Sequence, residues 1–143
     1  MTALLNGVLI TTPVTAALGP VMQTGARVGV PNNALLQGKL TYGSGGTTVD
    51  AWVQTSIDGG GSWCDVANFH FTTASARFIF NLSSTTVITT QLTPSDGTMA
   101  ANTSASGLIG PLWRVKYTTT GTYAGNTLLD VDLETSAPLT QSQ

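Results

Sequence analysis

The stretch TTVDAWVQTSIDGGGSWCDVANFHFT, residues 47–72, decides the fold class of this chain. Two runs in which apolar and polar residues alternate, 47–56 and 63–72, stand on either side of a glycine-rich octet. Because successive side chains of a strand point to opposite faces, this period is typical of half-buried strands. An Asp followed by three glycines supplies the side-chain acceptor and the positive φ angles that a tight turn needs. The stretch therefore predicts a β-hairpin.

The octet SIDGGGSW, residues 56–63, resembles an Asp-box, S-x-D-x-G-x-[ST]-W, a hairpin signature found in sialidases, other propellers and unrelated β-proteins. The matching residues are Ser56, Asp58, Gly60, Ser62 and Trp63. In those families the box is a structural turn remote from the active site, so the resemblance implies that Asp58 is a turn residue. The box occurs once here, whereas propellers carry it repeatedly, and 143 residues are too few for the usual ring of blades.

Alternating segments recur along the rest of the chain, separated by clusters of Gly, Pro, Asn or Ser. The best helical candidate, from Val14, is interrupted by Gly19 and Pro20, and a strand is preferred there. The predicted fold is all-β: one domain over residues 1–143, an antiparallel β-sandwich or jelly roll. Residues 93–107 have no periodicity and predict a long surface loop, and residues from about 136 predict a loose tail. The further predicted strands are 4–11, 14–18, 26–30, 34–43, 76–82, 86–92, 110–119 and 127–135.

The last two predicted strands carry complementary charges. An antiparallel hairpin between them sets Lys116 opposite Asp130 and Arg114 opposite Asp132. Such cross-strand pairs contribute about 0.2–1 kcal/mol each, which fixes a register without holding a fold. The residues expected in the core alternate with these charges: Trp113, Val115, Tyr117, Leu129, Val131 and Leu133.

The acids of the predicted strand 127–135 raise a second interpretation, because Asp130, Asp132 and Glu134 share one face and resemble a Ca²⁺ site. Residues two apart along a strand lie roughly 7 Å apart, whereas Ca²⁺ takes six to eight oxygens close together. Pairing with the basic strand is therefore preferred, and neither a metal nor a cofactor is expected.

Candidate catalytic residues do not converge in this sequence. Strand parity places Cys64 and His70 on one face, but six residues along a strand span roughly 20 Å, so the two do not meet through that strand. Glycoside hydrolysis needs two carboxylates flanking a sugar, and most acids here already have a turn or strand-surface interpretation. The glycines at 43–46 precede a strand and not a helix, so they predict a hairpin loop and not a phosphate cradle. An enzyme is not expected.

Two aromatic residues are candidates for contact with a partner. Trp52 alternates with Asp50 and Gln54 on the polar face of its run, so it is either an exposed contact or is covered by a neighbouring loop. Exposed tryptophans are typical of subunit interfaces and of surfaces that stack on sugars. Tyr123 is the second candidate for stacking on a glycan.

The composition restricts the partners. Only 8% of the residues are charged, with a net charge of −2, so a nucleic-acid footprint of clustered basic groups is not expected. No apolar run reaches the ~18 residues of a membrane span. The N-terminus lacks the features of a signal peptide, and Cys64 is the single cysteine, so we expect synthesis in a cytoplasm without a disulfide framework.

The segment VQTSIDGGGSWCDVANFHFTTASARFIFNLS resembles a stretch of small β-rich virion proteins of tailed phages and prophages, most strongly over residues 47–83. The resemblance implies a capsid or tail component located in the virion. The expected function is that of a capsid decoration protein, assembled as a homo-oligomer with the major capsid protein or tail proteins. The alternatives are a tail or connector component and a carbohydrate-binding module of a tail fibre or adhesin.

Overall fold

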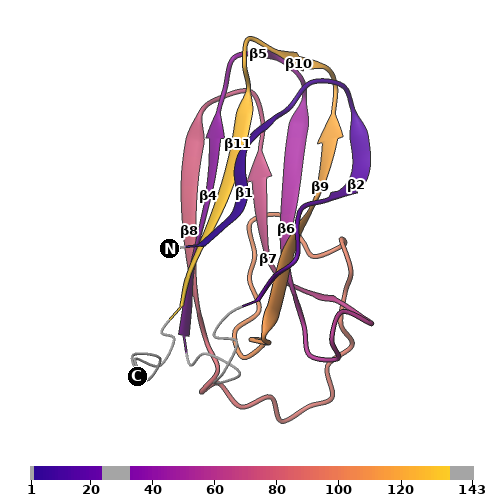
Figure 1. The fold of residues 1–143 in the computed structure, drawn as a ribbon, viewed down its shortest axis with the longest axis vertical. Helices are drawn as coiled ribbons and strands as arrows, with labels where there is room; N and C mark the ends of the chain where they lie inside the picture. The colour runs from indigo at the N-terminus through magenta and orange to yellow at the C-terminus, as the bar shows by residue number, and fades with distance from the viewer. Residues whose placement is uncertain (1, 24–32, 136–143) are drawn as a thin grey trace.

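The computed structural model describes residues 2–23 and 33–135, so the predicted strand 26–30 and the predicted tail lie outside the described residues. The described chain consists of strands and loops, with no helix, and its strands form antiparallel sheets (Figure 1). The all-β sandwich prediction is confirmed. The strands are β1 (Thr2–Leu9), β2 (Val14–Leu18), β3 (Met22–Gln23), β4 (Asn33–Thr41), β5 (Ser44–Gly45), β6 (Thr48–Ser56), β7 (Cys64–Phe71), β8 (Ala76–Ser83), β9 (Leu112–Thr120), β10 (Tyr123–Ala124) and β11 (Leu128–Thr135).

Two sheets face each other across the core (Figure 1). The first, which we name sheet A, has the strand order β1-β11-β4-β8, and the second, sheet B, has the order β2-β9-β6-β7, with β3 also paired to β9. The short ribbon β5–β10 lies at the upper end in Figure 1. The hairpin predicted from residues 47–72 is β6–β7 of sheet B.

Alternate residues of both sheets point inward and form one apolar cluster. Phe69 of sheet B and Phe80 of sheet A meet with ring centroids 5.2 Å apart, and Phe71 stacks on Phe78 at 5.5 Å. The Phe69 ring also lies directly on Gly38 in the middle of β4, where an added Cβ would be 2.5 Å from Phe69 Cγ. The contact between the sheets therefore requires glycine in a strand that otherwise alternates regularly.

The predicted charged hairpin is wrong in its pairing. Strand β9 pairs with β2 and β6 of sheet B, whereas β11 pairs with β1 and β4 of sheet A, so the ion pairs Lys116–Asp130 and Arg114–Asp132 do not form. The chain crosses between the sheets after β9 because β10 pairs with the distant β5. The predicted inward residues Trp113, Val115, Leu129, Val131 and Leu133 are nevertheless buried, and Tyr117 is half-buried.

The structure also differs from the predicted strand at 86–92 and from the predicted partner of Asp130. Residues 86–92, predicted as a strand, form none and belong to the long connection between β8 and β9, which runs under the lower end of the sandwich (Figure 1). The apolar residues of this segment, Val87, Ile88 and Leu92, remain exposed. The acid Asp130 lies opposite Lys39 of β4 and accepts the backbone N–H of Gly7 at 2.7 Å.

Candidate functional site

The Asp-box octet forms the turn between β6 and β7, and its hydrogen bonds are internal. Asp58 Oδ1 accepts from the Ser56 hydroxyl at 2.9 Å and from Ser62 N at 2.8 Å, and Oδ2 accepts from the Ser62 hydroxyl at 2.6 Å. Gly60 N donates to Ser56 Oγ at 3.0 Å, with φ of +93° at Gly60. The hydrogen bonds from Ser62 and Ser56 lower the pKa of Asp58 to about 2. This carboxylate is therefore committed to its own turn.

Strand β7 contains a bulge that sequence parity did not reveal. In the pairing with β6, Val53 lies opposite Ala67 and Gln54 lies opposite Asp65, so Val66 has no opposite residue. The extra residue reverses the alternation below it. Asp65 consequently lies on the outer face of sheet B with Gln54, and the expectation that Cys64 shares a face with His70 is wrong.

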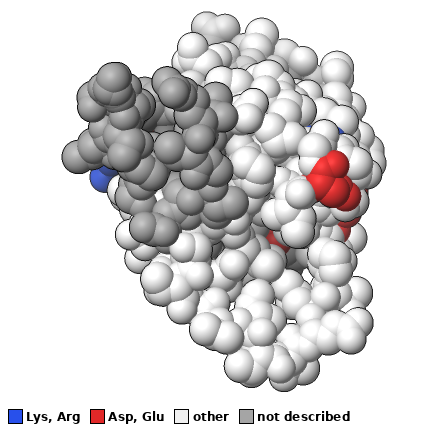
Figure 2. Space-filling model, turned by 60° about the horizontal axis from the view of Figure 1, so that its bottom comes forward, with Lys and Arg blue, Asp and Glu red and all other residues white. Residues whose placement is uncertain are grey.

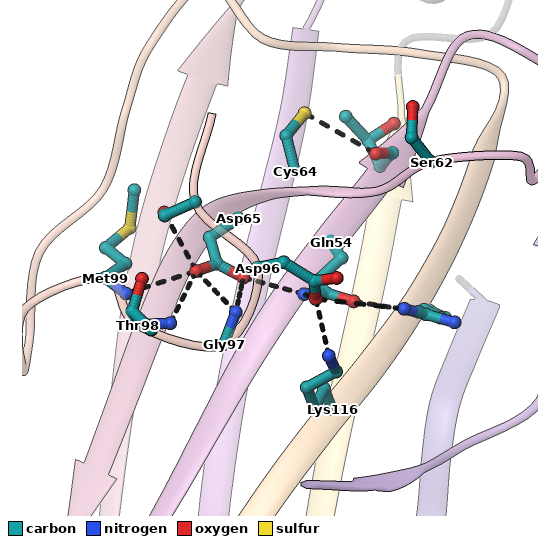
Figure 3. A network of polar contacts seen from close by, with 12 residues as sticks. Gln54, Ser62, Cys64, Asp65, Asp96, Gly97, Thr98, Met99 and Lys116 are labelled. Carbon is teal, nitrogen blue, oxygen red and sulfur yellow. Dashed lines mark hydrogen bonds and ion pairs between the residues drawn. The ribbon is translucent and has the colours of Figure 1, made fainter. Parts of the chain in front are cut away.

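Asp65 is 1% exposed and its carboxylate binds one turn of the predicted loop 93–107 (Figure 3). Burial by itself raises the pKa of Asp65, but hydrogen bonds from Gln54 and from three successive backbone N–H groups lower it, and the net shift is downward. Successive N–H groups that point at one anion form a concave binding site for it. The donors are Gln54 Nε2 (2.8 Å), Ser95 Oγ (2.9 Å) and the backbone nitrogens of Gly97 (2.9 Å), Thr98 (3.0 Å) and Met99 (3.1 Å).

A second acid of the same loop, Asp96, reaches the basic residues of β9 (Figure 3). Asp96 Oδ1 accepts from Gln54 Nε2 at 2.6 Å and from Lys116 Nζ, which lowers the pKa of Asp96. Arg114 Nε donates to Gln54 Oε1 at 2.8 Å. The two basic residues that were predicted to pair with β11 thus hold loop 93–107 against sheet B. The guanidinium of Arg114 also lies 4.3 Å from the centre of the Trp63 ring.

Backbone hydrogen bonds attach loop 93–107 along the outer edge of β7 as well. Asp65 N donates to Ser95 O, Asn68 N donates to Thr103 O, and Ala105 N donates to Val66 O, each at 2.8 Å. The loop therefore occupies the edge of sheet B that would otherwise present unpaired backbone groups. Loop 93–107 is thus held against sheet B by backbone hydrogen bonds to β7 and by the side-chain hydrogen bonds of Asp65 and Asp96.

The two candidate contact aromatics are not exposed in the way that a sugar platform requires. Trp52 is half-buried, and its Nε1 donates to the carbonyl of Met99 at 3.0 Å, which is the loop-covered alternative. Tyr123 is 1% exposed, its hydroxyl donates to Thr72 O at 2.9 Å, and its ring meets Tyr42 edge-on. The prediction that Tyr123 is a surface contact is wrong, because the β5–β10 ribbon turns its side chain inward.

His70 pairs with an acid on the outer face of sheet B. Its Nδ1 lies 2.7 Å from Asp50 Oδ1, and Asp50 lies between His70 on β7 and Thr118 on β9. In a nucleophilic triad the histidine stands between the acid and the hydroxyl. Here the carboxylate is in the middle, and the Thr118 hydroxyl accepts the backbone N–H of Ala16 at 2.9 Å. This order fixes the orientation of His70 and does not activate Thr118.

The most exposed apolar surface lies at the lower end of the sandwich, between the Asp-box turn and the connection after β8. We name it the apolar end and define it by Ile57 (81% exposed), Val87 (78%), Ile88 (43%) and Leu92 (46%). A groove of about 330 Å³ is lined by Ile57, Ile88 and Leu92 of this set, together with Trp63, Cys64 and Leu108. Figure 2 brings this end forward and shows mostly uncharged residues among those described. Large exposed apolar patches mark interaction surfaces.

Within residues 2–23 and 33–135, no three His, Cys, Asp or Glu side chains gather as metal ligands, and no helix is long and apolar enough to cross a membrane. The Cys64 thiol points to Thr55 O at 3.5 Å, and burial raises its pKa. No family model, curated protein or solved structure matches this chain.

Proposed function

We propose that this protein is a structural subunit of a tailed-phage virion, and specifically a capsid decoration protein that docks on the particle through its apolar end. The observation that supports the proposal is the exposure of Ile57, Ile88 and Leu92 around one groove, with the exposed Val87 next to Ile88 in the chain. An apolar surface with few charges favours association by shape and burial, and long-range steering contributes little.

The geometry beside the apolar end suits a docking role, because the surrounding loop is held in place before any partner arrives. Asp65 and Asp96 fix the 95–99 turn by side-chain and backbone hydrogen bonds. A surface that is already ordered loses less conformational entropy on binding. The Asp-box turn, which carries Ile57, is ordered in the same way by Asp58.

The carbohydrate-binding alternative depended on exposed aromatic rings at Trp52 and Tyr123. Tyr123 is buried, and Trp52 is half-buried with its Nε1 bonded to Met99 of loop 93–107, so neither is the fully exposed ring that stacking on a sugar favours. A tail or connector position belongs to the same class of function as capsid decoration, and the experiment below separates these positions.

The proposal is tested on purified particles of the phage or prophage that encodes the chain. We expect the protein in intact particles at a fixed ratio to the major capsid protein by quantitative mass spectrometry, and on tail-less heads after separation. Its presence on tails alone would place it at a tail or connector position, and its absence from particles would overturn the proposal.

The contact itself is tested by adding purified protein back to particles that lack it. We expect Ile57→Glu and Leu92→Glu to reduce binding at least tenfold, because each puts a charge into an apolar contact. Leu9→Glu is the matched control, since Leu9, the last residue of β1, is 54% exposed and is not part of the apolar end. Equal binding by the wild type and the Ile57→Glu variant would contradict docking through the apolar end.

A further inference from the structure

The edges of the two sheets differ in how they are protected from pairing with another chain. The β7 edge carries loop 93–107. The β1 and β2 edges are irregular: β1 shifts register twice against β11 and has Gly7 at φ +60°, and β2 shifts against β9 and has Ala16 at φ +54°. Bulges and covering loops are the devices that keep strand edges from associating. Three of the four edges therefore have such a device.

The fourth edge, β8, is regular. Its residues from Ser83 to Ala76 pair with β4 in one unbroken register, and over residues 76–82 no described segment pairs with its outer side. Two of its four exposed residues are apolar, Phe78 at 39% and Ile79 at 51% exposed, and the other two are Arg77, its one charged residue, and Asn81. A regular, exposed edge with few charges is a site where a further strand adds.

The direction of the β8 backbone groups follows from the alternation of the ladder. Ser83 N donates away from β4, to Ser106 Oγ at 3.3 Å, and Tyr42 N at the end of β4 donates toward the β8 side, to Ser75 Oγ at 2.8 Å. Because N–H and C=O groups of an antiparallel strand alternate between its two sides, the groups of Arg77, Ile79 and Asn81 point outward with those of Ser83.

We infer that β8 pairs with β8 of a second copy of this chain, antiparallel, about a two-fold axis at Ile79. In this register Ile79 faces its own copy, and Arg77 of each chain faces Asn81 of the other. Each facing pair exchanges N–H···O bonds in both directions through the groups that point outward. The resulting contact is isologous, as in most dimers, and joins the two A sheets into one continuous sheet.

Side chains on both faces suit this register. On the outer face Arg77 meets a neutral amide that can accept its N–H groups, and the two Arg77 side chains stay at opposite ends of the contact. On the inner face Phe78 of one copy comes beside Phe80 of the other in a non-hydrogen-bonded pair, where Cα atoms approach to about 4.5 Å. No acid lies on β8 to favour a basic partner strand.

The size of the contact predicts its strength. An eight-residue strand is about 26 Å long, and one strand per chain buries less than the ~800 Å² per partner of a standard stable interface. We therefore expect a concentration-dependent dimer with a dissociation constant on the order of 1 µM or weaker. The inference does not rest on the proposed function, because the β8 edge and the apolar end are different surfaces.

Sedimentation equilibrium on the purified full chain tests the dimer. We expect the mass to rise from 14.7 kDa toward twice that value with concentration.

Variants of Ile79 test whether β8 forms the contact. Ile79→Pro removes an outward N–H that β4 does not use, and proline is tolerated at such edge positions. We therefore expect a native circular dichroism spectrum and at least tenfold weaker dimerisation. Ile79→Lys, which keeps the N–H but adds a charge, serves if the proline variant fails to fold. Val87→Lys is the control and should dimerise like the wild type.

The register is tested by cysteine cross-linking in a Cys64→Ser background. Facing residues of a hydrogen-bonded pair have Cα atoms about 5.5 Å apart, within the range that a disulfide spans. We expect Ile79→Cys to form a disulfide-linked dimer under mild oxidation and Asn81→Cys to form at least tenfold less. A wild-type chain that stays monomeric would overturn the inference. This outcome is also expected if β8 pairs only with a different protein. A dimer that Ile79→Pro and Ile79→Lys leave unchanged, or equal cross-linking at residues 79 and 81, would likewise overturn the inference.

Discussion

At the scale of single residues, Asp65 has the largest structural role among the charged side chains. Its buried carboxylate binds three consecutive backbone N–H groups of a loop that is about 30 residues away in the chain, and the same acid accepts from Gln54. A buried acid with this many donors keeps its charge, because the hydrogen bonds replace the lost hydration. Asp65 thereby links β7, β6 and loop 93–107.

We expect Asp65→Asn to lower the free energy of unfolding by about 2–4 kcal/mol, since an amide cannot accept all of these N–H groups and the charge-assisted bonds are lost. Urea unfolding at pH 7 measures this. Asp130→Asn is the matched control: Asp130 lies on the outer face of sheet A with the N–H of Gly7 as its donor, and a change of less than about 1 kcal/mol is expected. Equal effects of the two substitutions would contradict the role given to Asp65.

The pH dependence of stability follows from three acids whose pKa values are lowered in the folded state: Asp58, Asp65 and Asp96. A lowered pKa stabilises the fold above the pKa of the unfolded chain, 3.8 for Asp, and the contribution is lost as the pH falls through the folded value. Asp132, whose pKa is raised by burial and by Asp130, has the opposite sign. We expect the free energy of unfolding to fall as the pH is lowered from about 4 toward 2.

Urea titrations at a series of pH values, with NMR titration of the Asp58 carboxyl, measure this dependence. Asp58→Asn should flatten part of the decline, because that variant has no proton to take up at residue 58. An Asp58 midpoint near 3.8, or a stability that is constant across this range, would show that the hydrogen bonds from Ser56 and Ser62 are not maintained in solution.

At the scale of elements, period-two alternation predicted the positions of most strands, but it predicted their partners only for the hairpin β6–β7. The runs 47–56, 63–72 and 76–82 correspond to β6, β7 and β8 within a residue or so at each end. Alternation reports that one face of a strand is buried, but it does not say against which strand. Strands β9 and β11 were therefore paired with each other by proximity in the chain, although they lie in different sheets.

The candidate site was harder to predict than the strands, because it depends on an irregularity. The bulge at Val66 places Asp65 on the outer face, and a two-against-one pairing leaves no mark in a pattern of period two. The available signals were a charged residue between two apolar neighbours, Cys64 and Val66, and the turn-forming sequence Ser95-Asp96-Gly97. Neither signal indicates that the two segments meet.

We expect Gly38→Ala to destabilise the protein by about 1–3 kcal/mol or more, because the new methyl group would overlap the Phe69 ring and the two sheets would have to move apart. The adjacent substitution Gln37→Ala, on the outer face of the same strand, removes the acceptor of an Arg77 N–H and should change stability by less than about 1 kcal/mol. Thermal unfolding of both variants measures the difference. A harmless alanine at residue 38 would contradict the close approach of β4 and β7.

At the scale of the whole molecule, the position of β11 is decisive. This strand lies between β1 and β4, so the first and last described strands pair, with Thr2 opposite Leu133, while β11 also binds β4 along its whole length. Leu129, Val131 and Leu133 of β11 are buried in the middle of the core. Sheet A is thus two separate parts, β1 and β4–β8, until β11 joins them.

A chain that ends at Thr127 should therefore lack a cooperative unfolding transition by circular dichroism. A synthetic peptide of residues 128–135, added in excess, should restore the transition, and a peptide of the same composition in scrambled order should not. Cooperative unfolding of the shortened chain alone would show that sheet A forms without its central strand.

The same arrangement affects how the protein is made. A ribosome releases β1 and β4 long before β11, so the nascent chain exposes two strands whose common neighbour has not yet been translated. Sheet A can be completed only after β11 has left the ribosome, and translation at ~5–20 residues per second sets the length of this delay. Cells that produce this protein in quantity should therefore show its unfinished chains bound to ribosome-associated chaperones.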